Sequence, residues 1–214
     1  ICEVMNPDGT MMRLDGLLAL GEQHGIKVVT VADLIAYRLE HEPIVRRVAE
    51  VALPTDFGQF RAVLFESLVD SAVHAALVLG EPDKRTPTLV RVHRADLLTD
   101  VFGYLGNGQP GLAPGDRLRT ALEAIAAEGQ GVLLYLGTQN DGVLALETLR
   151  AHTSRARGGP GRPAHAMNFR EFGVGAQILS QLGLGPLRIL ANQPFPLIAG
   201  RGFGLDVVEW VRLG

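Results

Sequence analysis

Hydrophobic and polar positions in residues 1–38 alternate between strand-like runs and helical repeats. The apolar runs ICEVM and IKVVTV have the composition of strands, and each is followed by a stretch with apolar residues at helical spacing. This pattern predicts the order strand–helix–strand–helix, with Gly25 ending the first helix and Thr30 capping the second. Pro43 then interrupts the pattern, so residues 39–45 are expected to form a linker.

The pattern changes in residues 46–214, where strand-like segments come first. Four consecutive segments of this kind predict an antiparallel sheet. They are residues 45–54, 57–67, 71–81 and 88–96. A loop rich in Gly and Pro follows over residues 103–116.

After that loop, helical and strand-like segments alternate, which is typical of parallel strands joined by helices. Asp116 is expected to cap the first of these helices, and Leu118, Leu122 and Ile125 recur on one of its faces. The expected helices are 117–128, 143–157 and 171–183, and the expected strands are 131–137, 186–192 and 204–213. The predicted fold class is therefore mixed α/β (α+β), with an antiparallel N-terminal sheet and an alternating helix/strand second half.

The apolar opening ICEVM would be a buried strand, and a buried strand with nothing before it is an unusual natural N-terminus. We therefore expect the chain to be the C-terminal piece of a longer polypeptide.

Composition narrows the functional class of that polypeptide. The 20 basic and 23 acidic residues are nearly balanced, which gives no support for nucleic-acid binding. No apolar run approaches the roughly 20 residues of a membrane span, so a cytoplasmic protein is expected.

The motifs of both segments resemble two enzymes of riboflavin biosynthesis. Residues 1–38, with ICEVMNPDGTM and HGIKVVTVADLIAYR, resemble the C-terminal end of 3,4-dihydroxy-2-butanone 4-phosphate synthase. Residues 46–212 resemble GTP cyclohydrolase II on RVAEVALPTDFGQFRAVLFES, LVRVH, EFGVGAQIL, LGLGPLRILANQP and GFGLDVVEWVRL. The order matches a bifunctional protein of that pathway, and the resemblance implies a GTP cyclohydrolase II-like fold for residues 46–214.

The resemblance also implies a metal site that this chain lacks. GTP cyclohydrolase II opens the imidazole ring of GTP with a zinc ion held by three cysteines, because zinc makes hydroxide available from bound water near neutral pH. The first zinc cysteine of the family falls on Asp96 here, and the loop at 103–116 contains no cysteine. The one cysteine of the chain is Cys2, in the other segment. We expect no cofactor in residues 46–214, and magnesium for the parent synthase.

Other family positions are also changed. The glutamate and arginine beside the nucleotide fall on Gln139 and Asp141. Arg91, which in the family faces the GTP phosphates, and Arg170 are retained. Glu3 matches a synthase glutamate whose partners would lie upstream of this chain.

Three hypotheses follow. The one we favour is a non-catalytic module, a pseudoenzyme, that supports or regulates the fused synthase as part of a homodimer. The second is an active hydrolase with a metal held by His93, Asp96 and Asp100, although Asp96 is better interpreted as a cap and His93 as a structural hydrogen-bonding group. The third is a sensor that binds GTP through Arg91 and Arg170 without turnover.

Overall fold

The computed structural model describes residues 3–104, 114–138, 169–192 and 203–213. The helix expected at 143–157 and the loop over 105–113 lie outside these residues. The chain divides into two compact units, Ile1–Arg38 and Leu39–Gly214, which are described separately. No helix in the described ranges is long and apolar enough to cross a membrane.

Residues 3–41 contain the expected helices but not the expected strands. Helix α1 spans Leu14–His24 and ends at Gly25, which has a left-handed φ of 65°. Helix α2 spans Val31–His41, and Thr30 caps it because its hydroxyl accepts from the Asp33 N–H at 3.0 Å. The Asp33 carboxylate accepts in return from the Thr30 N–H at 3.1 Å, which completes a capping box.

Both strand predictions for this unit are wrong within the described residues. The opening run contributes one isolated bridge, between Met5 and Met11. Residues 26–30 form no strand, and Ile26 and Val29 are exposed. An apolar run becomes a strand only when a neighbouring strand pairs with it, and none does so in the described part of this unit.

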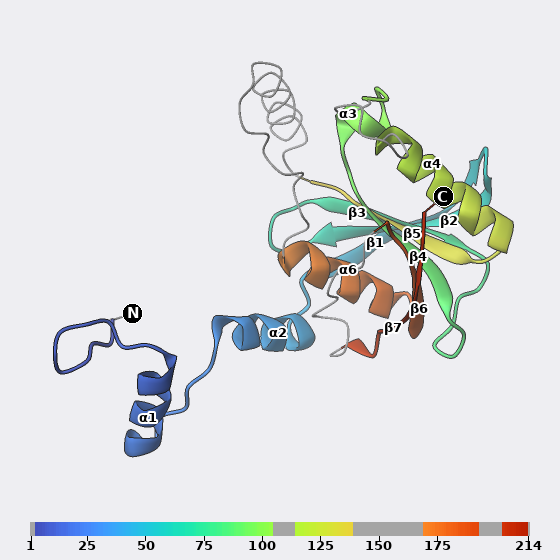
Figure 1. The fold of residues 1–214 in the computed structure, drawn as a ribbon. Coiled ribbons are helices and arrows are strands. Elements are labelled where there is room, and N and C mark those ends of the chain that lie inside the picture. The colour runs from blue at the N-terminus through green and yellow to red at the C-terminus, as the bar shows by residue number, and fades with distance from the viewer. Residues whose placement is uncertain (1–2, 105–113, 139–168, 193–202, 214) are drawn as a thin grey trace, which may run out of the picture. The chain divides into compact units, whose positions relative to one another are not determined.

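The second unit is built on a seven-stranded sheet with the order β1-β2-β3-β5-β4-β6-β7 (Figure 1). The strands are β1 Val45–Thr55, β2 Gly58–Ser67, β3 Val73–Leu79, β4 Thr88–Arg94, β5 Gly131–Leu136, β6 Pro186–Leu190 and β7 Asp206–Val211. Strands β1, β2, β3 and β5 pair antiparallel in that order, whereas β5, β4, β6 and β7 pair parallel. The mixed α/β class and the parallel second half are confirmed.

The prediction that the fourth strand joins the antiparallel sheet is wrong. Strand β4 does not pair with β3, because β5 lies between them and runs parallel to β4. The connection from β4 to β5 contains helix α3 (Leu97–Asp100) and helix α4 (Pro114–Glu128), as a parallel pair requires. Strand β5 is almost wholly buried, as expected for a central strand.

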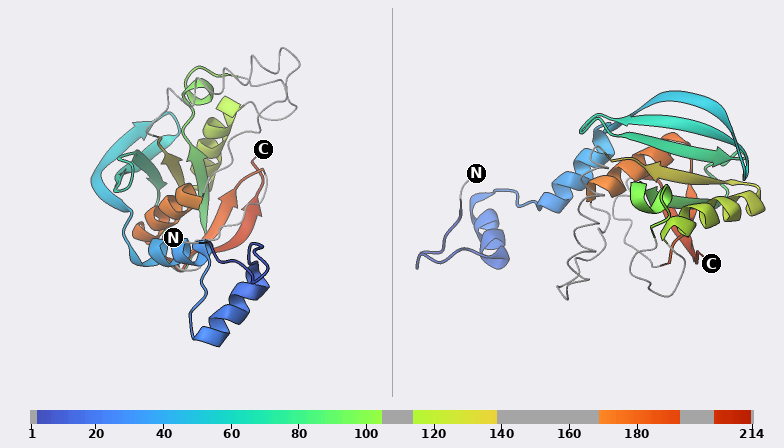
Figure 2. Two further views of the ribbon diagram at one scale, coloured as in Figure 1. Left: turned by 90° about the vertical axis from the view of Figure 1, so that its left-hand side faces the viewer. Right: turned by 90° about the horizontal axis from the view of Figure 1, so that it is seen from above.

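Helices α4 and α6 (Phe169–Gln181) cover opposite faces of the sheet, called here the α4 face and the α6 face (Figure 2). On the α4 face, Leu122 and Ile125 pack against Leu89 and Leu133, as their helical spacing predicts. On the α6 face, the helix residues Val174, Ile178 and Leu179 pack against Val63, Phe65, Val90 and Leu134.

The prediction that Asp116 caps α4 is also wrong. The helix begins at Pro114, so Asp116 lies in its first turn instead of capping it. Proline suits the first helical position because its missing N–H has no acceptor there in any case. The negative charge of Asp116 still lies at the end of the helix dipole that favours it.

Buried His74, on the α6 face, makes the stability of the fold depend on pH. It lies on β3 opposite Phe65, is 5% exposed, and neither of its ring nitrogens has a hydrogen-bond partner among the described groups. Burial lowers the pKa of His74 below 6.5, although the charge of Asp70 opposes this. The unfolded chain therefore binds a proton more readily than the folded chain.

We expect the contribution of His74 to the free energy of unfolding to be fully present above pH 6.5. Below that pH, the free energy of unfolding should fall by up to about 1.4 kcal/mol per pH unit because of this group. Urea unfolding on both sides of pH 6.5 measures the effect. His74→Leu should flatten the dependence, whereas His24→Gln, at an exposed histidine, should leave it unchanged. Equal slopes for His74→Leu and the unmodified chain would contradict this assignment.

Candidate functional site

The carboxyl ends of β4 and β5 bring three polar side chains onto the α4 face. Arg91 is in register with Leu133, and His93 is in register with Tyr135. Residues paired in this way point to the same side of the sheet, so all three share the face of Leu133. The His93 and Tyr135 rings stack with centroids 5.6 Å apart and planes 15° apart. This end of a parallel sheet is where α/β proteins commonly bind ligands.

Asp100, the last residue of α3, is the centre of this cluster. Its carboxylate lies 2.9 and 3.0 Å from Nε2 of His93 and accepts from the Tyr135 hydroxyl at 3.0 Å. It also accepts from the Asp96 N–H at 3.0 Å and from the Thr99 hydroxyl at 3.2 Å. The Asp100 side chain is only 3% exposed, so these bonds replace nearly all of its contact with water.

The hydrogen bonds keep the buried Asp100 ionised. Burial by itself would raise the pKa of this carboxyl group. The bond from His93, the bond from the Asp96 N–H, the charge of His93 and the bond from Tyr135 together outweigh burial and lower the pKa below its ordinary 3.8. An ionised carboxylate only accepts hydrogen bonds, so His93 donates through Nε2. Its Nδ1 is buried without a partner among the described groups.

Asp96, which by the resemblance falls on a zinc-cysteine position, acts as the N-cap of α3. Its side chain accepts from the Leu98 N–H at 3.0 Å and from the Thr99 N–H at 3.3 Å. This is the capping role that the sequence favoured for it. His93 and Asp100 face each other, whereas the Asp96 carboxylate faces the helix N–H groups.

The residues that the structure places here do not fit a zinc ion. A ligand must direct a lone pair at the metal, and both Asp96 and Asp100 direct theirs at N–H and O–H donors. The described ranges contain no group of three or more His, Cys, Asp and Glu arranged to hold a metal. The sole thiol, Cys2, belongs to the other segment of the chain.

Arg91 lies half-buried beside this cluster. One of its terminal nitrogens, Nη1, donates to the Leu190 carbonyl at 3.0 Å, while Nε has no partner among the described groups. Burial lowers the pKa of Arg91, and the charge of Arg117 on α4 lowers it further, against the attraction of Asp100. Two guanidinium groups therefore repel each other here with no carboxylate bonded to Arg91 in the described structure.

The roles predicted for the remaining site residues stay predictions. Glu3 is exposed in the first unit. Arg170 lies in the first turn of α6, but its side chain is outside the described set. Gln139 and Asp141 lie outside the described residues.

Sequence reasoning missed Tyr135 and the ion pair of Arg94 with Glu171. Tyr135 could have been noticed as the one residue with a hydroxyl in the apolar strand GVLLYL. Arg94 at the end of β4 contacts Glu171 in the first turn of α6 at 2.9 Å. These two residues are far apart in sequence, so only the strand order could have revealed that contact.

The comparisons with known proteins agree with this arrangement. The family model for GTP cyclohydrolase II matches residues 46–212. The chain belongs to the GTP cyclohydrolase II family. The model for 3,4-dihydroxy-2-butanone 4-phosphate synthase matches residues 1–37 of this cyclohydrolase II-family chain. Both matches confirm the resemblance drawn from the motifs.

Relatives of this family member match along its whole length. The riboflavin biosynthesis protein RibBA of Bacillus cereus (strain AH187) is 43% identical over 221 residues, which cover 100% of this chain and 54% of the relative. The protein of the same name from Bacillus mycoides (strain KBAB4) is 42% identical over the same shares. The chain thus spans about half the length of the curated relatives it matches.

A solved structure has the same fold. It is the crystal structure of RibBX, a two-domain 3,4-dihydroxy-2-butanone 4-phosphate synthase from A. baumannii. The TM-score is 0.57 at 28% sequence identity, with 93% of this chain and 50% of that chain covered.

Proposed function

We propose that residues 46–212 are a non-catalytic GTP cyclohydrolase II-like module, a pseudoenzyme, in a protein of riboflavin biosynthesis. The module supports or regulates the 3,4-dihydroxy-2-butanone 4-phosphate synthase to which residues 1–37 are related. One observation carries the proposal: the chain has a single cysteine, Cys2, outside the module. A zinc site made of three thiolates cannot be built from it.

Two further observations support this function. The carboxylates of Asp96 and Asp100, the two acidic residues considered as metal ligands, are already bonded to N–H and O–H donors. In addition, RibBX, which shares the fold, is a two-domain 3,4-dihydroxy-2-butanone 4-phosphate synthase. A cyclohydrolase II-like module attached to a synthase is therefore a reasonable arrangement for such a protein.

The proposal includes the setting in which the module acts. It operates in the cytoplasm as part of a homodimer, attached to its synthase. Magnesium is required by the synthase half and not by residues 46–212. The names of the RibBA relatives support the pathway, since they are called riboflavin biosynthesis proteins.

Formate release from GTP tests the proposal directly. The purified chain, supplied with zinc and magnesium, should release formate at the uncatalysed background rate, because the loss of several cooperating groups removes most of the catalytic effect. A family member with the three cysteines, assayed in parallel, serves as the positive control. Formate release at a rate comparable to that control would refute the proposal.

The same preparation separates the two remaining hypotheses. Stoichiometric bound metal that is lost in His93→Ala would favour a hydrolase with a substitute metal site. GTP binding by calorimetry without formate release, abolished in Arg91→Ala, would favour a sensor. The sensor has one specific observation in its favour, namely that Arg91 is bonded to no carboxylate in the described structure and is repelled by Arg117.

A further inference from the structure

Helix α6 holds the segment that leads into the sheet. Residues 42–44 join α2 to β1. Gln177 of α6 accepts from the Ile44 N–H at 2.9 Å and donates to the Glu42 carbonyl at 2.7 Å. Pro43, between these two residues, lacks an N–H and has a fixed φ, so the segment is stiff. One amide side chain, only 6% exposed, therefore bonds to the backbone on both sides of Pro43.

A second glutamine on the same helix extends this contact. Gln181 donates to the Val45 carbonyl at 3.3 Å. Side chains four residues apart lie on one side of a helix, so Gln177 and Gln181 reach the same stretch of backbone. The Ile44 side chain also packs against the α6-face core. The two glutamines, bonded to the backbone of residues 42–45, are called here the linker clamp.

The other end of α6 contacts the carboxyl end of β4. Glu171, in the first turn of α6, lies 2.9 Å from Nε of Arg94, and these side chains are 17% and 23% exposed. Arg94 is in register with Leu136 of the α6-face core. The preceding residue, His93, points to the α4 face and bonds to Asp100. The end of β4 thus carries the Asp100 cluster on one face and the contact to α6 on the other.

Helix α6 connects these two places in one element. Glu171 and Gln181 are ten residues apart, or about 15 Å along the helix axis. Gly173 and Gly175 lower the intrinsic stability of the helix by about 1 kcal/mol each, so α6 depends on its contacts at both ends. Between the ends, four buried residues pack against the sheet, namely Val174, Ala176, Ile178 and Leu179. A close-packed helix of this kind transmits a displacement from one end to the other.

We propose that α6 couples the carboxyl end of β4 to the linker clamp, so that opening of the Arg94–Glu171 contact loosens residues 42–45. This inference rests on the proposed function, in which residues 46–212 regulate a synthase related to residues 1–37. Residues 42–44 lie between the synthase-related segment and the module along the chain. A change at the Asp100 cluster reaches the synthase side through β4, α6 and the clamp, in that order.

Hydrogen exchange of the Ile44 amide, followed by NMR on the purified chain, measures whether the clamp is closed, because Gln177 is the acceptor of this N–H. Gln177→Met removes the bond with little change in side-chain volume, and the amide should exchange about tenfold faster. Glu171→Gln, more than 100 residues away from Ile44 in sequence, should accelerate it about threefold. Unchanged exchange in the central strand β5 shows that each variant is folded.

The double variant tests whether the two contacts are coupled. If the effect of Glu171 passes through Gln177, then adding Glu171→Gln to Gln177→Met should accelerate Ile44 exchange no further. A further acceleration would mean that the two ends of α6 act independently, which would overturn the proposal. Glu171→Gln changes a side chain outside the core, so the coupling stays testable even if Gln177→Met does not fold.

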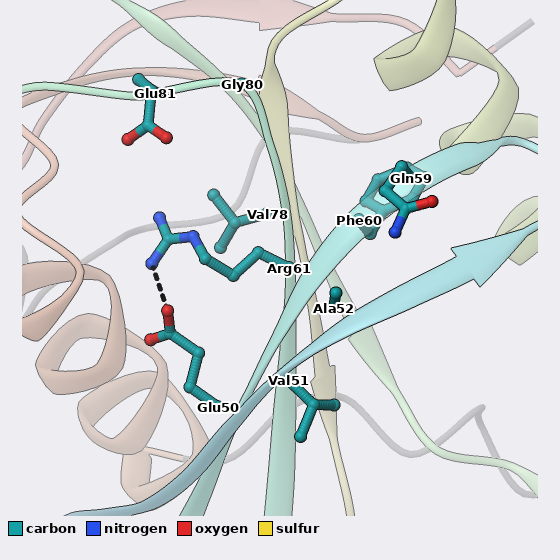
Figure 3. A pocket seen from close by; sticks show the side chains of 9 residues that line it. All are labelled: Glu50, Val51, Ala52, Gln59, Phe60, Arg61, Val78, Gly80 and Glu81. Atoms are coloured by element: carbon teal, nitrogen blue, oxygen red, sulfur yellow. Dashed lines mark hydrogen bonds and ion pairs between the residues drawn. The ribbon is translucent and has the colours of Figure 1, made fainter.

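The ion pair of Arg61 with Glu50 is the matched control. The two charged groups lie 3.5 Å apart in a shallow pocket of about 440 Å³ (Figure 3). Arg61 is opposite Val78 of the α6-face core, so the pair lies on the same face of the sheet as α6. Arg61 also pairs with Ala52, near the end of β1 that is far from the clamp. Arg61→Gln should therefore leave Ile44 exchange unchanged.

Three other results would overturn the coupling. They are unchanged Ile44 exchange in Gln177→Met, unchanged exchange in Glu171→Gln, and equal acceleration in Arg61→Gln and Glu171→Gln. None of them depends on formate release from GTP, which tests the proposed function. A chain that releases no formate and shows no coupling would keep the non-catalytic module and lose this route of regulation.

Discussion

Replacement of Asp100 by alanine is expected to lower the free energy of unfolding by about 3 kcal/mol, because it leaves several buried donors unpaired. The Nε2–H of His93, the Tyr135 hydroxyl and the Asp96 N–H all bond to this one carboxylate. His93 is 6% exposed, so water does not readily take the place of the lost acceptor. Urea unfolding near neutral pH measures the change.

Asp96→Ala is the control for this variant. It removes a carboxylate four residues away whose bonds go to two N–H groups at the start of α3. Loss of such a cap costs about 1 kcal/mol. If Asp100→Ala were no more destabilising than Asp96→Ala, Asp100 would not be the centre of the cluster. Asp100→Asn should fall between the two, because the amide keeps one acceptor.

The predicted helices were correct where local chemistry decides them. Thr30 caps α2 through a bond to a residue three positions away, and Gly25 ends α1 because its backbone is left-handed. Interactions of this range are contained in the sequence pattern. The apolar run at 26–31 was misassigned because the same residue types serve as a strand only when another strand pairs with them.

The order of the strands could not be read from the sequence. Strands β3 and β4 follow each other along the chain, yet β5 separates them in the sheet. Alternation of residues shows that a segment is a strand, but it does not show which neighbour it has. The apolar character of β5 correctly indicated a central position, and a central β5 displaces β4 from β3.

In the candidate site, the local features could be predicted from the sequence, whereas the contacts that depend on strand order could not. His93, Asp96 and Asp100 were singled out because they are close in sequence, and the capping role of Asp96 is local. The bond from Tyr135 to Asp100 spans 35 residues and depends on the parallel pairing of β4 with β5. The contribution of β5 to the cluster could therefore be identified only from the structure.

Gly137→Ala is expected to destabilise the protein by about 2–3 kcal/mol, since overpacking against a fixed backbone forces strands apart. Gly137 directly follows β5, and a Cβ at this position would lie 2.0 Å from the Val73 carbonyl oxygen at the start of β3. That oxygen belongs to the backbone of a paired strand, so it cannot rotate away as a side chain would. Thermal and urea unfolding measure the loss.

Gly175→Ala is the matched control, at a glycine where an added Cβ causes no clash. A Cβ there would meet only the Leu134 Cδ2 atom, at 3.6 Å, which is ordinary contact. Because alanine favours a helix interior over glycine by about 1 kcal/mol, this variant should be neutral or more stable than the unmodified chain. Opposite signs for the two substitutions would show that the close approach of β3 and β5, and not the loss of a glycine, sets the cost at Gly137. Equal effects would mean that β3 can move away from β5, and the His93–Tyr135–Asp100 cluster would then rest on a less rigid pair of strands.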